Sequence, residues 1–291
     1  MTVGPERGLV SFVGAGPGAA DLITLRGAER LGRADVVVWA SSLVPEALLE
    51  HAGAGAEIHD SAAMTLEDVL ALYAANDRRR VVRLHSGDPA IYGAVQEQID
   101  WCLAHGRSYE IVPGVSSLGA AAAAAGRELT LPGVAQSVVI TRLGGRTKAS
   151  MPARESLAAF AAIGATTAVF LSGARPRQLQ QQLLAGGSAW TAATPAVVVV
   201  RATWPDEQIV TTTVGSLAAA IESTGETRTV LVLVGDALAT SPRPPGGDAP
   251  DDASLPDAPG RRSHLYDPAF AHSFRKRSLP GSTAGRPVRR R

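Results

Sequence analysis

The sequence predicts an α/β protein with two α/β domains, mainly parallel sheets and a cleft between the domains. Short β-branched runs alternate with helical segments along most of the 291 residues, which is typical of parallel sheets with right-handed crossovers. Runs such as residues 196–200 are apolar throughout, as expected of strands buried on both faces. Pro132 and Gly133 interrupt the series and indicate a domain boundary.

The first domain is expected over residues 8–130. Strands are predicted at residues 9–13, 36–39, 80–85 and 109–112, with a short strand around Ile58. Helices are predicted at residues 22–31, 69–75, 90–105 and 118–125. Thr65 and Asp68 have the pattern of an N-cap and an acidic first turn before the second helix.

The second domain is expected over residues 136–238. Strands are predicted at residues 137–142, 167–171, 195–201, 209–213 and 229–234, and helices at 154–163, 176–184 and 217–222. Residues 239–291 are expected to form a Pro/Gly-rich linker and a basic tail, both largely disordered.

Composition excludes several classes of protein. No apolar run approaches the roughly 18 residues that cross a bilayer, and Met1–Gly8 has no apolar signal-peptide core. We therefore expect a cytoplasmic protein without a membrane partner. The single cysteine, Cys102, supports neither a disulfide framework nor a zinc cluster, so no metal is expected.

Charge is distributed unevenly along the chain. Residues 261–291 hold nine Lys/Arg and one acid, so the first 260 residues hold 19 basic and 26 acidic residues. A basic tail can bind nucleic acid. Within a Pro/Gly/Ser-rich stretch, such a tail is more often a solvated extension. We expect no nucleic-acid partner.

Three turns of small residues follow predicted strands, at residues 14–18, 85–89 and 112–117. Ligands of open α/β sheets bind at this edge. The first turn formally fits a dinucleotide fingerprint, but Ala40 stands where a ribose-binding acid is needed. Pro17 also removes a backbone donor that a pyrophosphate would use. A nicotinamide-dependent oxidoreductase is therefore disfavoured.

The polar residues of these turns have two interpretations. Asp88 before Pro89 fits a helix N-cap, and it equally fits a ligand contact beside Gly87. Ser116 and Ser117 could cap a helix or face the cleft. His85 is expected to be packed rather than to transfer protons.

The basic residues Arg142 and Arg146 are either a solvated loop or a clamp for carboxylates. No Ser-His-Asp spacing, metal-ligand cluster or P-loop is present in the sequence. The residues themselves identify no catalytic group.

Taken together, the turns resemble the tetrapyrrole methylase family, which are S-adenosylmethionine-dependent (class III) methyltransferases. The resemblance covers about residues 8–238. The matching segments are Val13–Gly18 with Asp21–Thr24, His85–Pro89 with Tyr92-Gly93, and Val112–Ser117.

Further segments are similar to those of family members that methylate C11 of precorrin-4. They are Ser41–Pro45, Leu84–Pro89, Thr141-Arg142 with Gly145–Thr147, Arg201–Glu207 and Ser263–His272. The related uroporphyrinogen methylases carry an acid where this chain has Ala40, which argues against uroporphyrinogen as the substrate.

The resemblance implies a homodimeric methyltransferase of cobalamin biosynthesis that uses S-adenosylmethionine to convert precorrin-4 to precorrin-5. Cobalt-precorrin-4 and another tetrapyrrole are the alternative acceptors. The implied cofactor contacts are Pro17, Ser86, Gly87, Asp88, Ile91, Tyr92, Ser116, Ser117, Leu171 and Ala202. The acceptor is expected beside Gly14, Gly16 and Gly18, with its carboxylates near Arg142 and Arg146.

Overall fold

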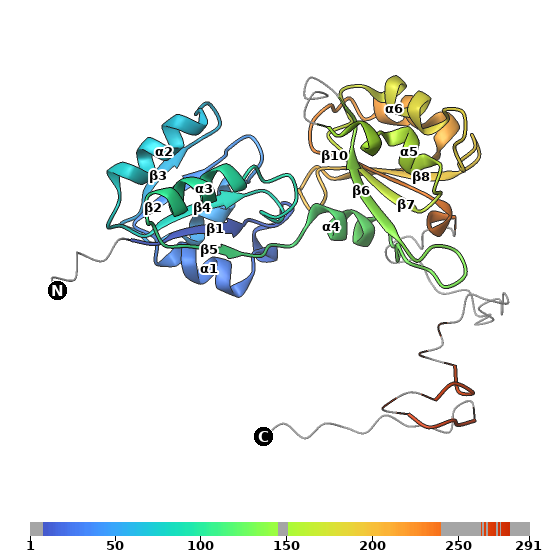
Figure 1. Cartoon of the computed structure of the whole chain (residues 1–291), viewed down its shortest axis with the longest axis horizontal. Coiled ribbons are helices and arrows are strands. Elements are labelled where there is room, and N and C mark those ends of the chain that lie inside the picture. Colours follow the sequence, from blue (N-terminus) through green and yellow to red (C-terminus); the bar gives the residue numbers. More distant parts are fainter. Residues whose placement is uncertain are drawn as a thin grey trace.

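The computed structural model describes residues 8–144 and 151–239, together with residues 263, 265, 267–271, 273 and 275–279. Two five-stranded sheets, each flanked by helices, follow one another along the chain (Figure 1). Within these described residues, five of the eight strand pairings are parallel. The predicted α/β class with mainly parallel sheets is confirmed, whereas the domain limits at residues 130 and 136 stay a prediction.

The first sheet has the strand order β3-β2-β4-β1-β5, and all its pairings are parallel. Its strands are β1 (Val10–Gly14), β2 (Val36–Trp39), β3 (Glu57–Asp60), β4 (Val81–His85) and β5 (Tyr109–Val112). Because β1 lies between β4 and β5, the turns that follow these three strands meet at one edge of the sheet.

Alternate residues of the central strands pack on opposite faces of this sheet. Val13 and Leu84 face α1 (Leu25–Gly32) and the 3₁₀ helix η2 (Glu46–His51). Val10 and Phe12 face α2 (Leu66–Ala75) and α3 (Gln96–Ala104). Both faces are therefore covered, which explains why β2 is apolar throughout and β1 and β4 are largely apolar. Cys102 is buried on the face that includes Val10 and Phe12.

The second sheet has the order β6-β7-β10-β8-β9. Its strands are β6 (Val138–Arg142), β7 (Thr166–Phe170), β8 (Pro195–Val200), β9 (Gln208–Thr213) and β10 (Val230–Val234). Among the strands that the structure describes in this sheet, only β6 and β7 pair in parallel. The short connection from β8 to β9 explains an antiparallel pair there, because parallel neighbours need a long crossover.

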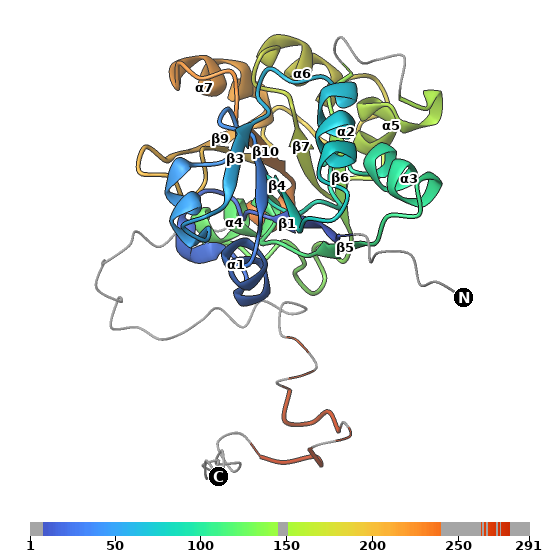
Figure 2. The same cartoon turned by 90° about the vertical axis from the view of Figure 1, so that its left-hand side faces the viewer.

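Helices cover the second sheet unequally. The helices α5 (Leu157–Ala161), α6 (Pro176–Leu183) and α7 (Leu217–Ser223) pack on one face. On the other face lies α4 (Ser117–Ala124), which follows the first sheet in sequence. Figures 1 and 2 show α4 against the β10 side of this sheet. The chain thus crosses to the second sheet before β6 begins.

Short 3₁₀ helices complete the described elements. They are η1 (Ala20–Leu22), η4 (Ala153–Glu155), η5 (Val214–Ser216) and η6 (Asp236–Leu238). No helix of the described residues is both long and apolar enough to span a membrane. Most of the predicted tail, residues 239–291, lies outside the described residues.

One predicted helix starts later than expected. The sequence predicts a helix from residue 90, but α3 begins at Gln96, so Asp88 is not its N-cap. The intervening Tyr92 and Ala94 have φ of 54° and 49°, values that a right-handed helix does not allow. Residues 90–95 form a separate loop.

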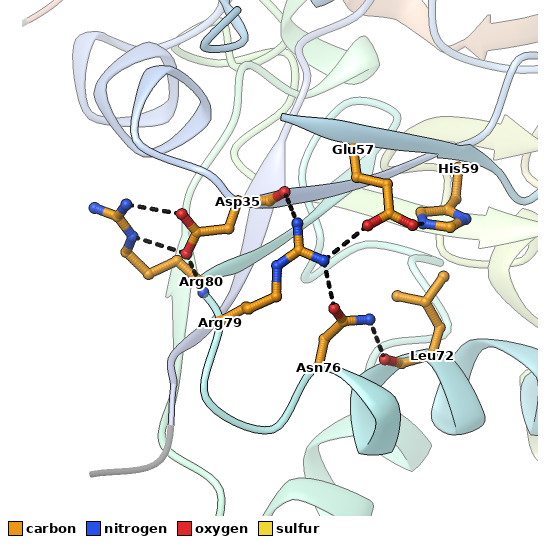
Figure 3. A network of polar contacts seen from close by, with 7 residues as sticks. All are labelled: Asp35, Glu57, His59, Leu72, Asn76, Arg79 and Arg80. Carbon is orange, nitrogen blue, oxygen red and sulfur yellow. Dashed lines mark hydrogen bonds and ion pairs between the residues drawn. The ribbon is translucent and has the colours of Figure 1, made fainter. Parts of the chain in front are cut away.

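The edge of the first sheet opposite the turns is tied by a polar network (Figure 3). Arg79 donates to Glu57 Oε2 and Asn76 Oδ1, both at 2.7 Å, and to the carbonyl of Asp35. Arg80 pairs with the Asp35 carboxylate at 2.9 Å, which holds the pKa of Asp35 below its usual range. The network joins the starts of β2, β3 and β4.

Candidate active site in the cleft

The three small-residue turns are bonded directly to one another. Gly87 N donates to Gly16 O at 2.8 Å, and the two glycines form an antiparallel bridge. The carboxylate of Asp88 accepts from Gly114 N at 3.0 Å. The turns after β1, β4 and β5 therefore form one unit.

Two glycines of this unit are required for packing between the turns. A Cβ on Gly14 would lie 2.4 Å from the Cα of Gly114, and one on Gly114 would lie 2.1 Å from Gly87 O. Both distances are shorter than van der Waals contact. The sequence suggests a ligand as the reason for small residues here, and the structure adds contact between backbones as a second reason.

A cavity of about 180 Å³ lies between these turns and the second sheet. Seven of the residues predicted to bind a cofactor line it: Pro17, Ser86, Ile91, Tyr92, Ser117, Leu171 and Ala202. They come from both halves of the chain, so the structure gathers around one cavity residues that the sequence places far apart.

The other three predicted cofactor contacts do not line the cavity. Asp88 accepts from Ala90 N at 2.7 Å in addition to its bond from Gly114. Ser116 is the N-cap of α4 and accepts from Leu118 N. Gly87 has a left-handed backbone, with φ of 66°, between Ser86 and Asp88. The side chains of Asp88 and Ser116 therefore accept hydrogen bonds from backbone amides and stabilise the turns.

Left-handed backbone at non-glycine residues is concentrated around the cavity. Among the described residues, Tyr92, Ala94, Leu171, Arg201, Thr203 and Thr229 have positive φ. Four of these six line the cavity: Tyr92, Leu171, Arg201 and Thr229. Each such residue costs about 1–3 kcal/mol, and strain of this kind clusters at functional sites.

His85 is the last residue of β4 and does not line the cavity. It is 6% exposed, packs 6.0 Å from the ring of Phe12, and its Nε2 is buried without a hydrogen-bond partner in the described chain. Burial, together with the nearby Arg83, lowers the pKa of His85 to about 3. A neutral, enclosed imidazole matches the packed role that the sequence predicts.

Tyr92 bridges the two halves at the cavity wall. Its ring lies 5.3 Å from that of Phe170, at the end of β7. Burial raises the pKa of Tyr92, and the positive charge of Arg142 opposes this effect. The phenol therefore stays protonated at neutral pH and can donate a hydrogen bond.

The residues predicted to bind an acceptor are only partly described. Gly14, Gly16 and Gly18 lie in the first turn, and Arg142 is half-buried at the end of β6. Its positive charge acts to lower the pKa of Tyr92, which lines the cavity. Arg146 lies outside the described residues.

Eight residues that line the cavity are not among the predicted site residues: Leu43, Phe170, Val199, Arg201, Trp204, Thr229, Val230 and Leu231. Arg201 and Trp204 belong to the segment Arg201–Glu207, whose likeness to a family signature could have identified them. Phe170 and Thr229 carry no such local signal. No group of three or more potential metal ligands occurs within residues 8–144 or 151–239.

Comparison with known proteins shows which family and which proteins this chain is similar to. The family "Tetrapyrrole (Corrin/Porphyrin) Methylases" matches residues 9–218. A Sinorhizobium protein named precorrin-4 C(11)-methyltransferase is 43% identical over 270 residues, which cover 92% of this chain and 98% of that protein. A Methanocaldococcus jannaschii protein named cobalt-precorrin-4 C(11)-methyltransferase is 42% identical, with 92% and 96% covered.

Solved structures agree with these relatives. A cobalt precorrin-4 methyltransferase superposes with a TM-score of 0.75 at 43% identity, covering 79% of this chain and 95% of that one. A uroporphyrin-III C-methyltransferase from Thermus thermophilus, complexed with S-adenosylhomocysteine, gives a TM-score of 0.65 at 29% identity, covering 80% and 99%. The chain belongs to the tetrapyrrole methylase family.

Proposed function

We propose that this chain transfers the methyl group of S-adenosylmethionine to C11 of precorrin-4, giving precorrin-5 in cobalamin biosynthesis. The observation that carries the proposal is the identity of 42–43%, over more than nine-tenths of the chain, to proteins named for this reaction. The expected homodimer and cytoplasmic location stay predictions.

The cavity suits S-adenosylmethionine. Apolar side chains such as Leu43, Ile91 and Val199 form much of its wall and can enclose an adenine ring. The hydroxyls of Ser86 and Ser117 can bond to polar groups of the ligand. Gly87 would then lie behind the ligand, between these two serines. The relative complexed with S-adenosylhomocysteine supports this assignment.

The acceptor is placed beside the Gly14–Gly18 turn. Precorrin-4 carries several carboxylates, and the planar guanidinium groups of Arg142 and Arg146 are suited to bind them. Because the first 260 residues have more acidic than basic residues, local positive charge must attract this anionic ligand.

Bound S-adenosylmethionine supplies an activated methyl group and its own leaving group. The tasks left to the protein are to align the two reactants and to exclude water. His85 does not line the cavity and its pKa is about 3, so it is not the proton acceptor. Tyr92 remains protonated and can orient a ligand as a donor. The proposal assigns no catalytic base.

The test is direct transfer of a labelled methyl group. The protein is incubated with precorrin-4 and S-adenosylmethionine carrying ¹³C in its methyl group, and the product is examined by NMR. We expect the label at C11. Label at another carbon would contradict the assigned position.

Relatives named for the metal-free and for the cobalt form are 43% and 42% identical to this chain, so similarity does not choose between the two acceptors. A parallel reaction with cobalt-precorrin-4 distinguishes them. Faster transfer to precorrin-4 supports the proposal as stated. Transfer only to the cobalt form would reassign the acceptor and keep the reaction type.

A further inference from the structure

The connection between β8 and β9, residues 201–207, bonds to the Gly-rich turn on the other side of the cleft. The indole Nε1 of Trp204 donates to the carbonyl of Pro17 at 3.0 Å. The amide of Ala19 donates to Thr203 Oγ1 at 2.9 Å. These two hydrogen bonds join residues that are 187 and 184 positions apart in the sequence.

Gly18 allows this approach. A Cβ on Gly18 would lie 2.2 Å from Cδ1 of Trp204 and 2.8 Å from Thr203 Oγ1. Glycine is therefore the only residue type that lets the indole and the hydroxyl reach the turn without displacement. The contact therefore depends on Gly18 in the turn as well as on Trp204 and Thr203.

The 201–207 segment is braced in a strained conformation. Arg201 and Thr203 have φ of 48° and 70°. Arg201 forms ion pairs with Asp206 and, at 3.2 Å, with Glu226. The carboxylate of Glu207 accepts from Thr203 N at 2.6 Å. Such strain persists only where surrounding contacts hold it, and here they present Thr203 and Trp204 to the turn.

The same segment also forms part of the cavity wall, through Arg201, Ala202 and Trp204. We propose that Trp204 and Thr203 are positioning residues for methyl transfer: they fix the Gly-rich turn, residues 14–19, relative to the cavity. This inference rests on the proposed function, which places the acceptor on the turn and the methyl donor in the cavity. A small misplacement of two reactants lowers the rate strongly.

Trp204→Phe tests the indole donor. The ring remains against Gly18 and the cavity, but the bond to Pro17 is lost. We expect kcat for methyl transfer to fall about fivefold to tenfold, as for one lost hydrogen bond, and to fall by a larger factor than the affinity for S-adenosylhomocysteine, because phenylalanine keeps an aromatic ring in the cavity wall. Trp101→Phe is the control, because Trp101 is also half-buried and lies on α3.

Thr203→Val and Thr203→Ser test the hydroxyl. Valine removes the acceptor for Ala19 N, whereas serine keeps it, so we expect a similar fall in kcat for the valine variant and recovery in the serine variant. Thermal unfolding of each variant identifies any that fail to fold. Equal kcat in Trp204→Phe and Trp101→Phe, with both folded, would overturn the inference.

Amide exchange gives a readout that does not depend on activity. We expect Thr203→Val, but not Thr203→Ser, to accelerate hydrogen exchange at Ala19 about fivefold, since the amide loses its acceptor. If the wild type transfers no methyl group to precorrin-4, the proposed function fails, and exchange at Ala19 still decides whether the 201–207 segment fixes the turn. Unchanged exchange in Thr203→Val would contradict that contact.

Discussion

Gly87 is the residue at which a single substitution best tests the cofactor's position. Its backbone is left-handed, and a Cβ there would point toward Ser117 N, 3.5 Å away. Since Ser86 and Ser117 line the cavity, a large side chain at position 87 enters the space between them. We expect Gly87→Trp to weaken S-adenosylhomocysteine binding about tenfold or more, as measured by calorimetry.

A matched control separates this effect from backbone strain. Gly187 also has positive φ, at 86°, and a Cβ there would meet no atom within 4 Å. Gly187→Trp carries similar strain outside the cavity and should bind S-adenosylhomocysteine like the wild type. Equal affinities for the two variants would show that the ligand does not lie against Gly87.

His85 should make stability depend on pH. Its pKa is lowered from 6.5 to about 3 by burial, so between these values the unfolded chain binds one more proton than the folded chain. The free energy of unfolding then falls as pH decreases below 6.5, by about 1.4 kcal/mol per pH unit. Urea unfolding at pH 7 and pH 5 measures this loss.

His85→Asn removes the titrating group and is the comparison for that experiment. We expect the variant to be less stable at pH 7, because a buried side chain is altered, yet to lose less stability than the wild type between pH 7 and pH 5. A parallel loss in both proteins would assign the acid sensitivity to other groups.

At the scale of elements, contact between turns should limit substitution at Gly14. A Cβ there would collide with Gly114 at 2.4 Å, so one of the two turns must move. We expect Gly14→Ala to lower the free energy of unfolding by about 1–3 kcal/mol. Gly55→Ala, whose Cβ would meet open space, should change it by less than about 0.5 kcal/mol.

Local sequence patterns predict most of the elements well. The strands at residues 36–39 and 109–112 have the predicted limits. Thr65 caps α2 in a capping box with Asp68, and Gly126 follows α4 with φ of 62°. In each case the signal lies within a few residues of the element that it specifies.

The remaining elements depend on distant contacts. The loop at residues 90–95 is shaped by the bonds of Asp88 to Ala90 and Gly114 and by positive φ at Tyr92. Two of the three antiparallel pairs described in the second sheet involve β8, whose apolar residues resemble those of a parallel strand. Neither feature follows from periodicity alone.

At the scale of the whole molecule, the two edges of the first sheet have different tasks. The turns and the cavity lie at one edge, and the network around Arg79 ties strand starts at the other (Figure 3). We expect Arg79→Met to lower the midpoint of thermal unfolding by a few degrees. The affinity for S-adenosylhomocysteine should stay within about twofold of the wild type, because the sites are independent.

Arg177→Met is the control for this prediction. The side chain of Arg177 is 85% exposed and forms an ion pair with Glu222, and exposed pairs contribute little to stability. It should leave both the midpoint and the affinity near those of the wild type. A change in affinity with Arg79→Met would mean that the two edges are coupled.

The sequence predicts many of the residues that line the cavity, but it does not predict the contacts between the two halves of the chain. Pro17, Ile91 and Leu171 were placed by family resemblance, and the structure gathers them around one cavity. The contacts of Trp204 and Thr203 with the Gly-rich turn could not be predicted, because they depend on how the two halves of the chain face one another.

The position of α4 determines where the polypeptide can be divided into complementing fragments. A break after residue 130 would leave Ala120 and Ala121 on the N-terminal piece, away from Val197 and Leu231, which they cover. Both pieces would then expose apolar surface and aggregate. A break between β5 and α4 instead keeps the helix with its sheet, so two separately expressed pieces should remain in solution and reassemble.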